Sequence, residues 1–578
     1  MAARLCVGVS LLITALIWRF HHVNLFTAGL LLFASLAIQG LVFVGYRVFI
    51  HPYWVSPMRH LPTPQVRHDE GFTTGLQSSE VEIRWNYMEI VADEFNNQGG
   101  HFFIGQMLNQ IKTPGPADIF ISWMRRWPDA PFVRYLTIGN TETLMVNSLA
   151  AFKEVQQTKA YSFRKSQLAG RMFSPITGHG LMFSEGDDRK RQRTQLSKAF
   201  SNQNTRRMLP VFQNKARLLC EAISHELGGE DRKLVDVERF LRKATLDVFV
   251  IGSIGCDLES ISLPEAHFYD VYERIIRQPA FGHIITFIDG HIPVRSWLPL
   301  KSNKMWLHDV ALIRTMLLNC VGNRTMEMMR EKRGLDGETR SERRDILTFI
   351  MEDCQFEEGE RLWTDEDLLE YMLNFIAGGH ETTGSTLMWV AYVLATNPGV
   401  QARLKSEVNE LCSGKPRDWD PTYEEVEHLS YLNNFLRETL RYYSPGIFLP
   451  REAAEDVTVC GVFVPMGTQV TLCPAVAHFN TTFWGPDAHI YDPDRWSDGR
   501  AAKDSYAMEA FLQGPSGCIA KNMALLNIKS VIIALVRNFT FSPRPGYDGT
   551  IELANPNFTL RPKDTLRVVI ERDDTITI

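Results

Sequence analysis

The first fifty residues carry the strongest hydrophobic pattern in the chain. Residues 5–18 form an apolar run of fourteen positions, and residues 25–46 form a second run without a charged side chain. A bilayer core of ~30 Å needs roughly 20 apolar residues as a helix, so the second run can cross it, whereas the first needs tilt or snorkelling. A cleaved signal peptide or a buried soluble hairpin would be the alternatives, but a longer apolar run does not usually follow a signal sequence. Residues 1–50 are therefore predicted to be a membrane anchor with one or two spans.

Behind the anchor, the sequence shows many segments of helical periodicity and a few short strand patterns. Apolar residues at a spacing near 3.6 predict helices, and alternating β-branched residues predict strands. The helical segments are residues 204–223, 238–251, 308–331, 365–396 and 429–443. The strand patterns are residues 132–138, 143–146, 457–464, 469–472 and 566–570, and a turn at 465–467 predicts a hairpin between two of them. The predicted body is mainly α with small β-sheets, in the α+β class.

Prolines are dense between the anchor and the body, at positions 52, 57, 62 and 64. Proline stiffens the chain and ends helices, so residues 51–65 are predicted to be a rigid hinge that lifts the body off the membrane. The charge-rich residues 330–345 are predicted to be an exposed loop within the body.

Composition excludes several classes of protein. With 45% hydrophobic and 22% charged residues the chain is globular, which excludes wholesale disorder. The net charge of −6, from 61 basic and 67 acidic residues, argues against a nucleic-acid partner. Nine cysteines include no Cys-x-x-Cys pair, so neither a zinc site nor a disulfide framework is expected.

The helix predicted at residues 365–396 contains the first candidate site, the sequence Gly-Gly-His-Glu-Thr-Thr at 378–383. Two glycines inside a helix cost roughly 1 kcal/mol each, so another interaction should compensate. Either a flat ligand lies against the bare backbone, or a second helix crosses closely at this point. The threonine hydroxyls can bond to carbonyls four residues back and open a local kink beside the acid Glu381.

A single cysteine forms the second candidate site. Cys518 lies in a Gly-Pro-Ser-Gly loop that begins at Gly514, seven residues after the aromatic Phe511 and just before a predicted helix. Loop amides and a helix N-terminus stabilise a thiolate, which is the form that a metal ligand needs. A lone cysteine is often inert, but the glycines on both sides favour a ligand.

Two charged motifs are weak signals when each is taken alone. Glu438 and Arg441 are three residues apart and share one face of a predicted helix. Arg495, in the sequence Pro-Asp-Arg-Trp, can dock into this pair and complete a buried, mutually satisfied network. A surface ion pair and an ordinary turn are the alternatives.

In their order and spacing, these motifs resemble the cytochrome P-450 family, the haem-thiolate monooxygenases, in its membrane-bound fungal form. The resemblance runs from the hinge to the C-terminus and implies that residues 99–578 are a haem-thiolate catalytic domain with the cytochrome P-450 fold. It implies haem b as the cofactor, Cys518 as the axial iron ligand, and Phe511 and Gly514 as its neighbours in the cofactor-binding loop. It also implies that Glu381 and Thr382 form the catalytic acid–alcohol pair that delivers protons to dioxygen.

The same resemblance assigns the remaining site residues. It implies a structural network behind the haem, formed by Glu438, Arg441 and Arg495. It also implies that two arginines, Arg193 and Arg451, bind the haem propionates. It places an apolar substrate pocket at Phe375, Ala377, Ile447 and Phe448.

Three positions depart from the family pattern. The family usually has a basic residue two positions before the cysteine, where this chain has Ser516. Arg189 replaces the aromatic residue usual four positions before Arg193, and Ala520 replaces a glycine. A functional haem site with altered affinity or potential is expected.

The resemblance implies a monooxygenase that oxidises a hydrophobic small molecule, such as a fungal terpenoid, polyketide or alkaloid, with O2. Electrons would come from an NADPH-dependent FAD/FMN reductase, and cytochrome b5 is a further candidate donor. The alternatives are a haem-thiolate isomerase and a haem-binding protein with degenerate oxygen chemistry. The body is expected to face the cytosol at the endoplasmic reticulum membrane, so the sequons at Asn323, Asn480, Asn538 and Asn557 should stay unmodified.

Residues 66–98 interrupt the family pattern. In fungal relatives the proline-rich hinge runs directly into a Gly-His-Phe-Phe stretch, and here thirty-three residues separate Gln65 from Gly99. A translated retained intron is one hypothesis, because thirty-three codons preserve the reading frame and the boundary residues are compatible with splice-site codons. A true surface insertion is the other, with residues 81–95 as an amphipathic helix near the membrane. Sequencing of the transcript distinguishes them.

Overall fold

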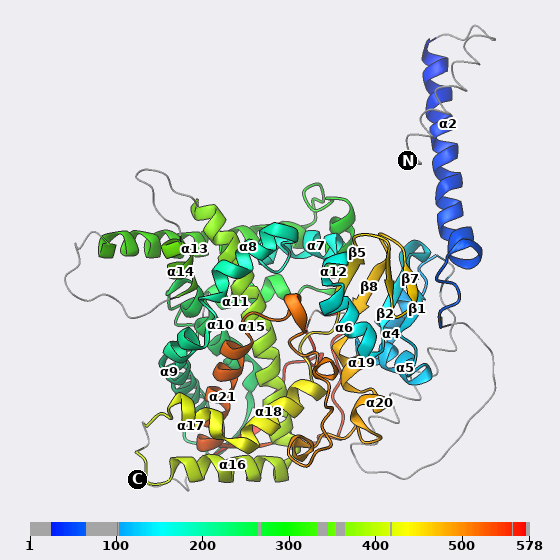
Figure 1. The fold of residues 1–578 in the computed structure, drawn as a ribbon. Coiled ribbons are helices and arrows are strands. Elements are labelled where there is room, and N and C mark those ends of the chain that lie inside the picture. Colours follow the sequence, from blue (N-terminus) through cyan, green and yellow to red (C-terminus); the bar gives the residue numbers. More distant parts are fainter. Residues whose placement is uncertain are drawn as a thin grey trace.

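The computed structural model describes residues 25–64, 101, 103–263, 267–332, 345–353, 364–416, 419–555, 557 and 559–573 (Figure 1). The apolar run at residues 5–18 and the atypical segment at 66–98 lie outside these residues, as do residues 333–344 of the charge-rich stretch. The described part confirms the predicted class, since helices dominate and the strands form small sheets.

Helices of very different length build the body. In the first half they are α4 (Met107–Lys112), α5 (Asp118–Arg126), α6 (Leu149–Lys153), α7 (Gln167–Thr177), α8 (Gly186–Ser197), α9 (Asn202–Leu227), α10 (Val237–Ile254), α11 (His267–Ile276), α12 (Ala280–His291) and α13 (Lys301–Lys332). In the second half they are α14 (Ile346–Asp353), α15 (Asp365–Thr396), α16 (Pro398–Cys412), α17 (Tyr423–His428), α18 (Ser430–Tyr442), α19 (Pro474–His478), α20 (Thr481–Trp484) and α21 (Lys521–Asn538). Short turns of other helix types include η3 (Glu154–Thr158), η5 (Pro493–Trp496) and η7 (Gly514–Ser516).

The long helix α15 has the bounds that the sequence predicted. Thr364 accepts from the Asp367 amide and the Asp367 carboxylate accepts from the Thr364 amide, which is a complete capping box. Asn397 ends the helix, and Pro398 starts α16 at once. Figure 1 shows α15 running through the middle of the body, where most of its residues are buried. This helix therefore carries the candidate site into the core.

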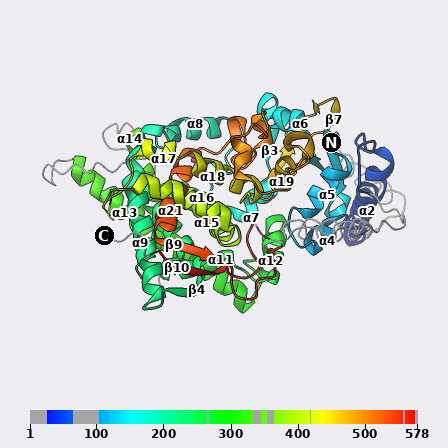
Figure 2. The same ribbon diagram turned by 90° about the horizontal axis from the view of Figure 1, so that it is seen from below.

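A five-stranded sheet lies on the side of the body from which α2 emerges (Figure 1). Its order is β1 (Phe132–Leu136), β2 (Glu142–Val146), β8 (Gln469–Leu472), β5 (Leu449–Ala453) and β3 (Phe163–Lys165), and only β2 and β8 run parallel. A second sheet, with the order β4 (Arg232–Asp236), β10 (Arg567–Arg572) and β9 (Phe539–Ser542), lies away from the first (Figure 2).

The predicted hairpin between residues 457–464 and 469–472 is wrong. Residues 457–464 instead form their own hairpin, β6 (Val457–Val459) and β7 (Val462–Val464). The reason is its two-residue turn, because Cys460 and Gly461 both have positive φ, at 47° and 78°, as a type I′ turn requires. β8 pairs with β5, which lies on the other side of this hairpin in sequence, and with β2, which lies far from it in sequence.

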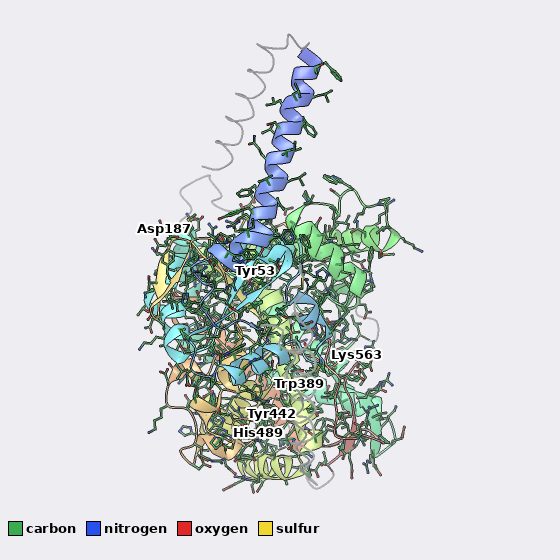
Figure 3. The ribbon with its side chains drawn as sticks, turned by 90° about the vertical axis from the view of Figure 1, so that its right-hand side faces the viewer. Tyr53, Asp187, Trp389, Tyr442, His489 and Lys563 are labelled. Atoms are coloured by element: carbon green, nitrogen blue, oxygen red, sulfur yellow. The ribbon has the colours of Figure 1, made fainter. Side chains whose placement is uncertain are left out.

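The N-terminal helix stands apart from the body (Figures 1 and 3). It consists of α2 (Leu25–Gly45) and a π-helical continuation, η1 (Tyr46–Val55). Within the described residues, Gly29–Val55 is one helix long and apolar enough to cross a membrane. Figure 3 shows Tyr53 where this helix meets the body.

The hinge region does not start at residue 51, because Pro52 lies inside η1 and the chain leaves the helix at Ser56. The junction is packed against the body. The Arg134 guanidinium donates to the Pro52 carbonyl and pairs with Glu142, and Met58 is buried in the core. The helix is therefore fixed to the β1–β2 side of the body at its base.

Candidate functional site

Cys518 lies in a loop that ends where α21 begins. Its backbone amide donates to the carbonyl of Phe511 at 2.8 Å, so the loop folds back on itself. Gly514 has φ +63°, and a Cβ there would lie 2.1 Å from the carbonyl oxygen of Gln156 in η3. Glycine at this position is therefore required both by its backbone angle and by the close approach of η3.

Cys518 keeps solvent-exposed surface although protein atoms surround its thiol closely. Burial raises the pKa of this thiol, whereas the Ala520 amide and the charges of Arg193 and Lys521 act to lower it. Phe511, which was expected near the sulfur, contacts Cys518 through its carbonyl, and its ring lies 5.8 Å from Nζ of Lys521.

The two glycines in the middle of α15 have different surroundings. A Cβ on Gly379 would lie 2.1 Å from Cδ1 of Phe249 on α10, so this glycine permits a close helix crossing. A Cβ on Gly378 would meet only the flexible Cε of Met182, at 3.1 Å. Of the two interpretations of the motif, the helix crossing holds for Gly379, and Gly378 remains the position at which a ligand could approach the backbone.

The threonine hydroxyls of the motif also differ. Oγ1 of Thr382 donates to the carbonyl of Gly378 at 2.7 Å, four residues back, as the sequence predicted. Thr386 repeats this bond to the carbonyl of Thr382 at 2.9 Å. The hydroxyl of Thr383 is buried and has no hydrogen-bond partner within the described residues.

Glu381 bonds to a different element from Thr382. Its Oε1 pairs with Nη1 of Arg242 on α10 at 3.0 Å, and the same guanidinium contacts Glu238 at 3.0 Å and Glu273 at 3.3 Å. Burial acts to raise the pKa of Glu381, but attraction by Arg242 prevails and lowers it. For Glu273, burial prevails and raises the pKa. Glu381 is thus an ionised acid held beside a second carboxyl group that protonates more readily.

His380, next to Glu381, is fully buried and neutral. Burial lowers its pKa to about 4. The Thr245 hydroxyl donates to the Arg242 carbonyl, so its 3.0 Å contact with Nδ1 of His380 makes that nitrogen the donor. Nε2 is then an acceptor, 3.8 Å from Oε1 of Glu381 and without a hydrogen bond inside the described ranges. The side chains of Glu273, His380 and Glu381 could together hold a metal ion, but the Arg242 guanidinium already supplies the positive charge.

The predicted network of Glu438, Arg441 and Arg495 is assembled in the structure, with all three side chains fully buried. Arg441 binds Glu438 through Nε at 2.9 Å and Nη2 at 2.7 Å, and Arg495 approaches the same carboxylate at 3.5 Å. Arg495 also pairs with Asp487 at 3.1 Å, and Nε1 of Trp496 donates to Glu438 at 3.0 Å. The charges of this network are matched inside the protein.

Four buried or half-buried cations surround the other side of the cysteine loop: Lys165 on β3, Arg189 and Arg193 on α8, and Arg451 on β5. Nη2 of Arg189 donates to the Pro515 carbonyl at 2.6 Å and to the Ser516 hydroxyl at 2.9 Å. Arg193 donates to the Gly517 carbonyl at 2.9 Å. Lys165 and Arg451 are cross-strand partners, an arrangement that repels unless an anion lies nearby.

The cytochrome P-450 family model matches residues 98–567, which is most of the chain. The chain belongs to the cytochrome P-450 family.

Related cytochrome P-450 proteins occur in fungi and in a mammal. The cytochrome P-450 monooxygenase sphH of Aspergillus fumigatus is 28% identical over 92% of this chain and 91% of its own. The monooxygenase buaD of Petromyces alliaceus is 25% identical over 92% and 90%, and cytochrome P-450 3A29 of Sus scrofa is 27% identical over 76% and 84%. The chain is accordingly an enzyme of the cytochrome P-450 monooxygenase class.

Cytochromes P-450 use haem with a cysteine thiolate ligand, and the residues of this chain fit that group. The cysteine is exposed, the backbone of Gly378 is bare, and a group of buried or half-buried cations forms no salt bridge with a carboxylate in the described part of the chain. A haem supplies an iron for the first, a flat ring for the second and two propionates for the third.

The four predicted pocket residues of this cytochrome P-450 have different surroundings. Ile447 lines a small apolar cavity together with Tyr442, Tyr443 and Leu560. Phe375 packs instead against Phe200, with ring centroids 5.6 Å apart. Phe448 contacts Phe120 at 5.0 Å, and Ala377 is half-buried on α15.

Sequence reasoning missed several residues that complete the site. Arg242, Glu273 and Lys165 each lie on elements far from the motifs, and none belongs to a recognisable pattern. Arg242 is fully buried, but α10 also carries Glu238, Arg239, Lys243 and Asp247, so no pattern in its sequence singles out Arg242. Such a buried charge requires a partner, but the sequence does not show which carboxylate supplies it.

Proposed function

We propose that this cytochrome P-450 is a membrane-bound haem-thiolate monooxygenase that hydroxylates or oxidises a hydrophobic small molecule of fungal secondary metabolism. The observation that carries the proposal is the Cys518 loop, which leaves the cysteine exposed beside the Ala520 amide and the charges of Arg193 and Lys521, groups that act to lower the pKa of the thiol against the effect of burial. Fungal relatives named as monooxygenases over nine-tenths of the chain support it. Electrons come from an NADPH-dependent FAD/FMN reductase, with cytochrome b5 as a further donor.

Cys518 is the proposed axial ligand, and its loop prepares it for that role. The bond from the Cys518 amide to Phe511 and the tight contact of Gly514 with η3 fix the direction of the side chain. When bound, a haem with a thiolate ligand supplies the activation of dioxygen and the oxidation of a C–H bond. Ligand position is therefore set by backbone geometry, before the cofactor binds.

Proton delivery is assigned to Thr382 and Glu381. The Thr382 hydroxyl rests on the Gly378 carbonyl at the one place on α15 where the backbone is bare, so it can exchange this acceptor for a ligand. Glu381 is ionised beside Arg242, and Glu273 shares the same guanidinium with a raised pKa. A proton can therefore reach Glu381 from Glu273 while the total charge around Arg242 stays constant.

Apolar groups around the site support a hydrophobic substrate. Ile447 and Phe448 are neighbours in one segment and Met182 comes from another, and Phe448 and Met182 keep exposed surface. Phe375 and Ala377 extend this apolar surface along α15. Substrate contacts of this kind orient a C–H bond and exclude water, which favours coupled turnover.

We also assign the enzyme to the endoplasmic reticulum membrane, with its body in the cytosol. The exposed apolar helix Gly29–Val55 supports membrane anchoring. Of the four sequons, Asn480 is buried and caps α20 by accepting from Thr482, so it is not available to a glycosyltransferase in the folded protein. Glycan attachment mapped to Asn323 or Asn538 would contradict the cytosolic orientation.

The decisive experiment is spectroscopic. The protein is expressed in microsomes with a reductase, and the reduced carbon-monoxide spectrum is recorded for wild type, Cys518→Ser and the control Cys412→Ser, whose thiol lies at the end of α16. Wild type and control should show the red-shifted Soret band of a thiolate-bound haem, and Cys518→Ser should lose it. The same band in Cys518→Ser would refute the ligand assignment, and metabolite profiling with NADPH then identifies the substrate.

A further inference from the structure

The cation cluster beside the cysteine loop is not balanced by the protein. Its members are Lys165, Arg189, Arg193 and Arg451, and none of them forms a salt bridge with a carboxylate in the described part of the chain. Glu185 is the one acid that acts on Lys165 and Arg451 within the described residues: its carboxylate accepts from the backbone amide of Lys165 at 2.8 Å, but it forms no salt bridge with either side chain. Burial and the neighbouring cations lower the pKa of Lys165 to about 7, and burial lowers that of Arg451 to about 10. A cluster in this state lacks anions.

Hydrogen-bond donors are also left over in the cluster. Both bonds of Arg189 use Nη2, the bond of Arg193 uses Nη1, and Arg451 donates through Nη1 to the carbonyl of Pro450. A guanidinium carries five N–H donors in a planar fork suited to carboxylates, so each arginine retains donors for a further acceptor. The ammonium group of Lys165 has three N–H donors, and two of them are used by hydrogen bonds to the carbonyls of Leu181 and Ser184.

Two of the three departures from the family pattern lie in contact, although 327 residues separate them. Ser516 stands where a basic residue is usual, and Arg189 reaches that position from α8 and donates to the Ser516 hydroxyl at 2.9 Å. Serine is short enough to admit the guanidinium, whereas a second long cation at 516 would repel it. The positive charge has therefore moved from the cysteine loop to the helix opposite.

We propose that Arg189 and Lys165 bind the haem propionates together with Arg193 and Arg451, and that Arg189 replaces the charge that the cysteine loop lacks at Ser516. This inference rests on the proposed haem site. It explains how four cations coexist beside one carboxylate, since two propionates bring the missing negative charges. The proposal also predicts that haem retention depends on the position of this positive charge in space, and not on whether α8 or the cysteine loop carries it.

The test relocates the charge. Arg189→Gln keeps a donor toward Pro515 but removes the cation, and Arg189→Gln combined with Ser516→Arg returns the cation from the loop side. The control is Arg191→Gln on the same helix, whose side chain is exposed and pairs with Asp188 at 3.0 Å. Haem transfer from each ferric holoenzyme to excess apomyoglobin is measured, with resonance Raman spectra of the propionate bending modes.

We expect Arg189→Gln to lose haem about tenfold faster than wild type, because a charge-assisted hydrogen bond contributes enough affinity for that factor. The double variant should return close to the wild-type rate, and Arg191→Gln should match wild type. If the double variant loses haem as fast as Arg189→Gln, the arginine only tethers the loop and the proposal is wrong.

A second measurement, on Lys165→Met, keeps the proposal testable if Arg189→Gln does not incorporate haem. The propionate bending modes of Lys165→Met should shift from those of wild type, because one donor has left the carboxylates. Unshifted modes in Lys165→Met would overturn the four-cation site. Failure of the haem-thiolate assignment itself is separate, since it would remove the red-shifted carbon-monoxide band from wild type, whereas failure of this inference leaves that band intact.

Discussion

The charged groups on the two sides of the cysteine loop are arranged on opposite principles. In the network of Glu438, Arg441 and Arg495, every charge meets an opposite charge inside the protein, and the three side chains are fully buried. In the cation cluster of Lys165, Arg189, Arg193 and Arg451, the partners are carbonyls and a hydroxyl, and the described residues supply no salt-bridging carboxylate. The first region is closed, and the second is open to a ligand.

The difference separates folding from cofactor binding. A closed network loses stability when one member is removed, because a buried charge is left without its partner. In an open cluster the positive charges are neutralised only when an anionic ligand binds. Removing one cation therefore relieves repulsion within the protein but weakens the binding of the ligand. Substitutions in the two regions should therefore affect different measurements.

The largest effect is expected for Glu438→Gln. This change leaves the buried guanidinium groups of Arg441 and Arg495 facing a neutral amide, at a cost of about 3–5 kcal/mol in the free energy of unfolding. Urea unfolding followed by tryptophan fluorescence measures it, with Arg437→Gln as the exposed control on α18. Equal midpoints for the two variants would show that the network is not needed for folding.

Thr382→Ala tests the proposed role of the Thr382 hydroxyl in proton delivery. Haem binding should survive, because Thr382 bonds to a carbonyl and not to the cofactor loop, while product formed per NADPH falls about a hundredfold and peroxide rises. The matched control is Thr383→Ala, which removes a hydroxyl without a partner within the described residues. Unchanged coupling in Thr382→Ala would mean that another group delivers the protons.

The sequence predicted those features that are encoded by residues close together in the chain. The bounds of α15 followed from a capping box and a proline, both encoded within a few residues. The three charges of the closed network also came from the motifs. The partner of β8 could not be predicted, because alternation identifies a strand but does not say which strand lies beside it.

The remaining omissions are long-range contacts. The prediction that Glu381 acts together with its neighbour Thr382 stays a prediction, and the structure adds a charge partner for Glu381, Arg242, which lies 139 residues away in sequence. Arg189 and Ser516 each looked like an isolated departure from the family pattern, and only the fold shows that they meet. Sequence identified which residues are chemically unusual, and tertiary structure decided which of them act together.

The adjacent glycines Gly378 and Gly379 of α15 allow a closely packed position to be compared with an open position within one helix turn. Gly379→Ala would place a Cβ 2.1 Å from the ring of Phe249, and overpacking of this kind costs about 1–3 kcal/mol of stability. Gly378→Ala meets only the end of Met182, at 3.1 Å, and should be tolerated or slightly stabilising because alanine favours helix. Thermal unfolding compares them, and equal destabilisation would remove the distinction between a closed and an open glycine.

The smallest effect is a pH dependence that only the open cluster should produce. Without an anion, the pKa of Lys165 lies at about 7, lowered from 10.5 first by burial and then by its cationic neighbours. Propionates beside Lys165 would raise that pKa, so Lys165 takes up a proton when haem binds. The affinity for haem is therefore greatest below pH 7 and weakens as the pH rises above about 7. The charged groups that face Lys165 are Arg189, Arg193, Arg451 and Glu185.

Lys165 is the member of this cluster whose pKa lies near 7, so it is the group expected to titrate in this range. The apparent haem dissociation constant, measured by competition with apomyoglobin, should rise by less than about tenfold for each pH unit between pH 7 and pH 9, since a single proton is involved. Lys165→Met should bind haem more weakly below pH 7 and show a flatter profile, while the exposed control Lys190→Met should keep the wild-type slope. A Lys165→Met profile as steep as that of wild type would place the titrating group elsewhere and remove Lys165 from the cluster that binds the cofactor.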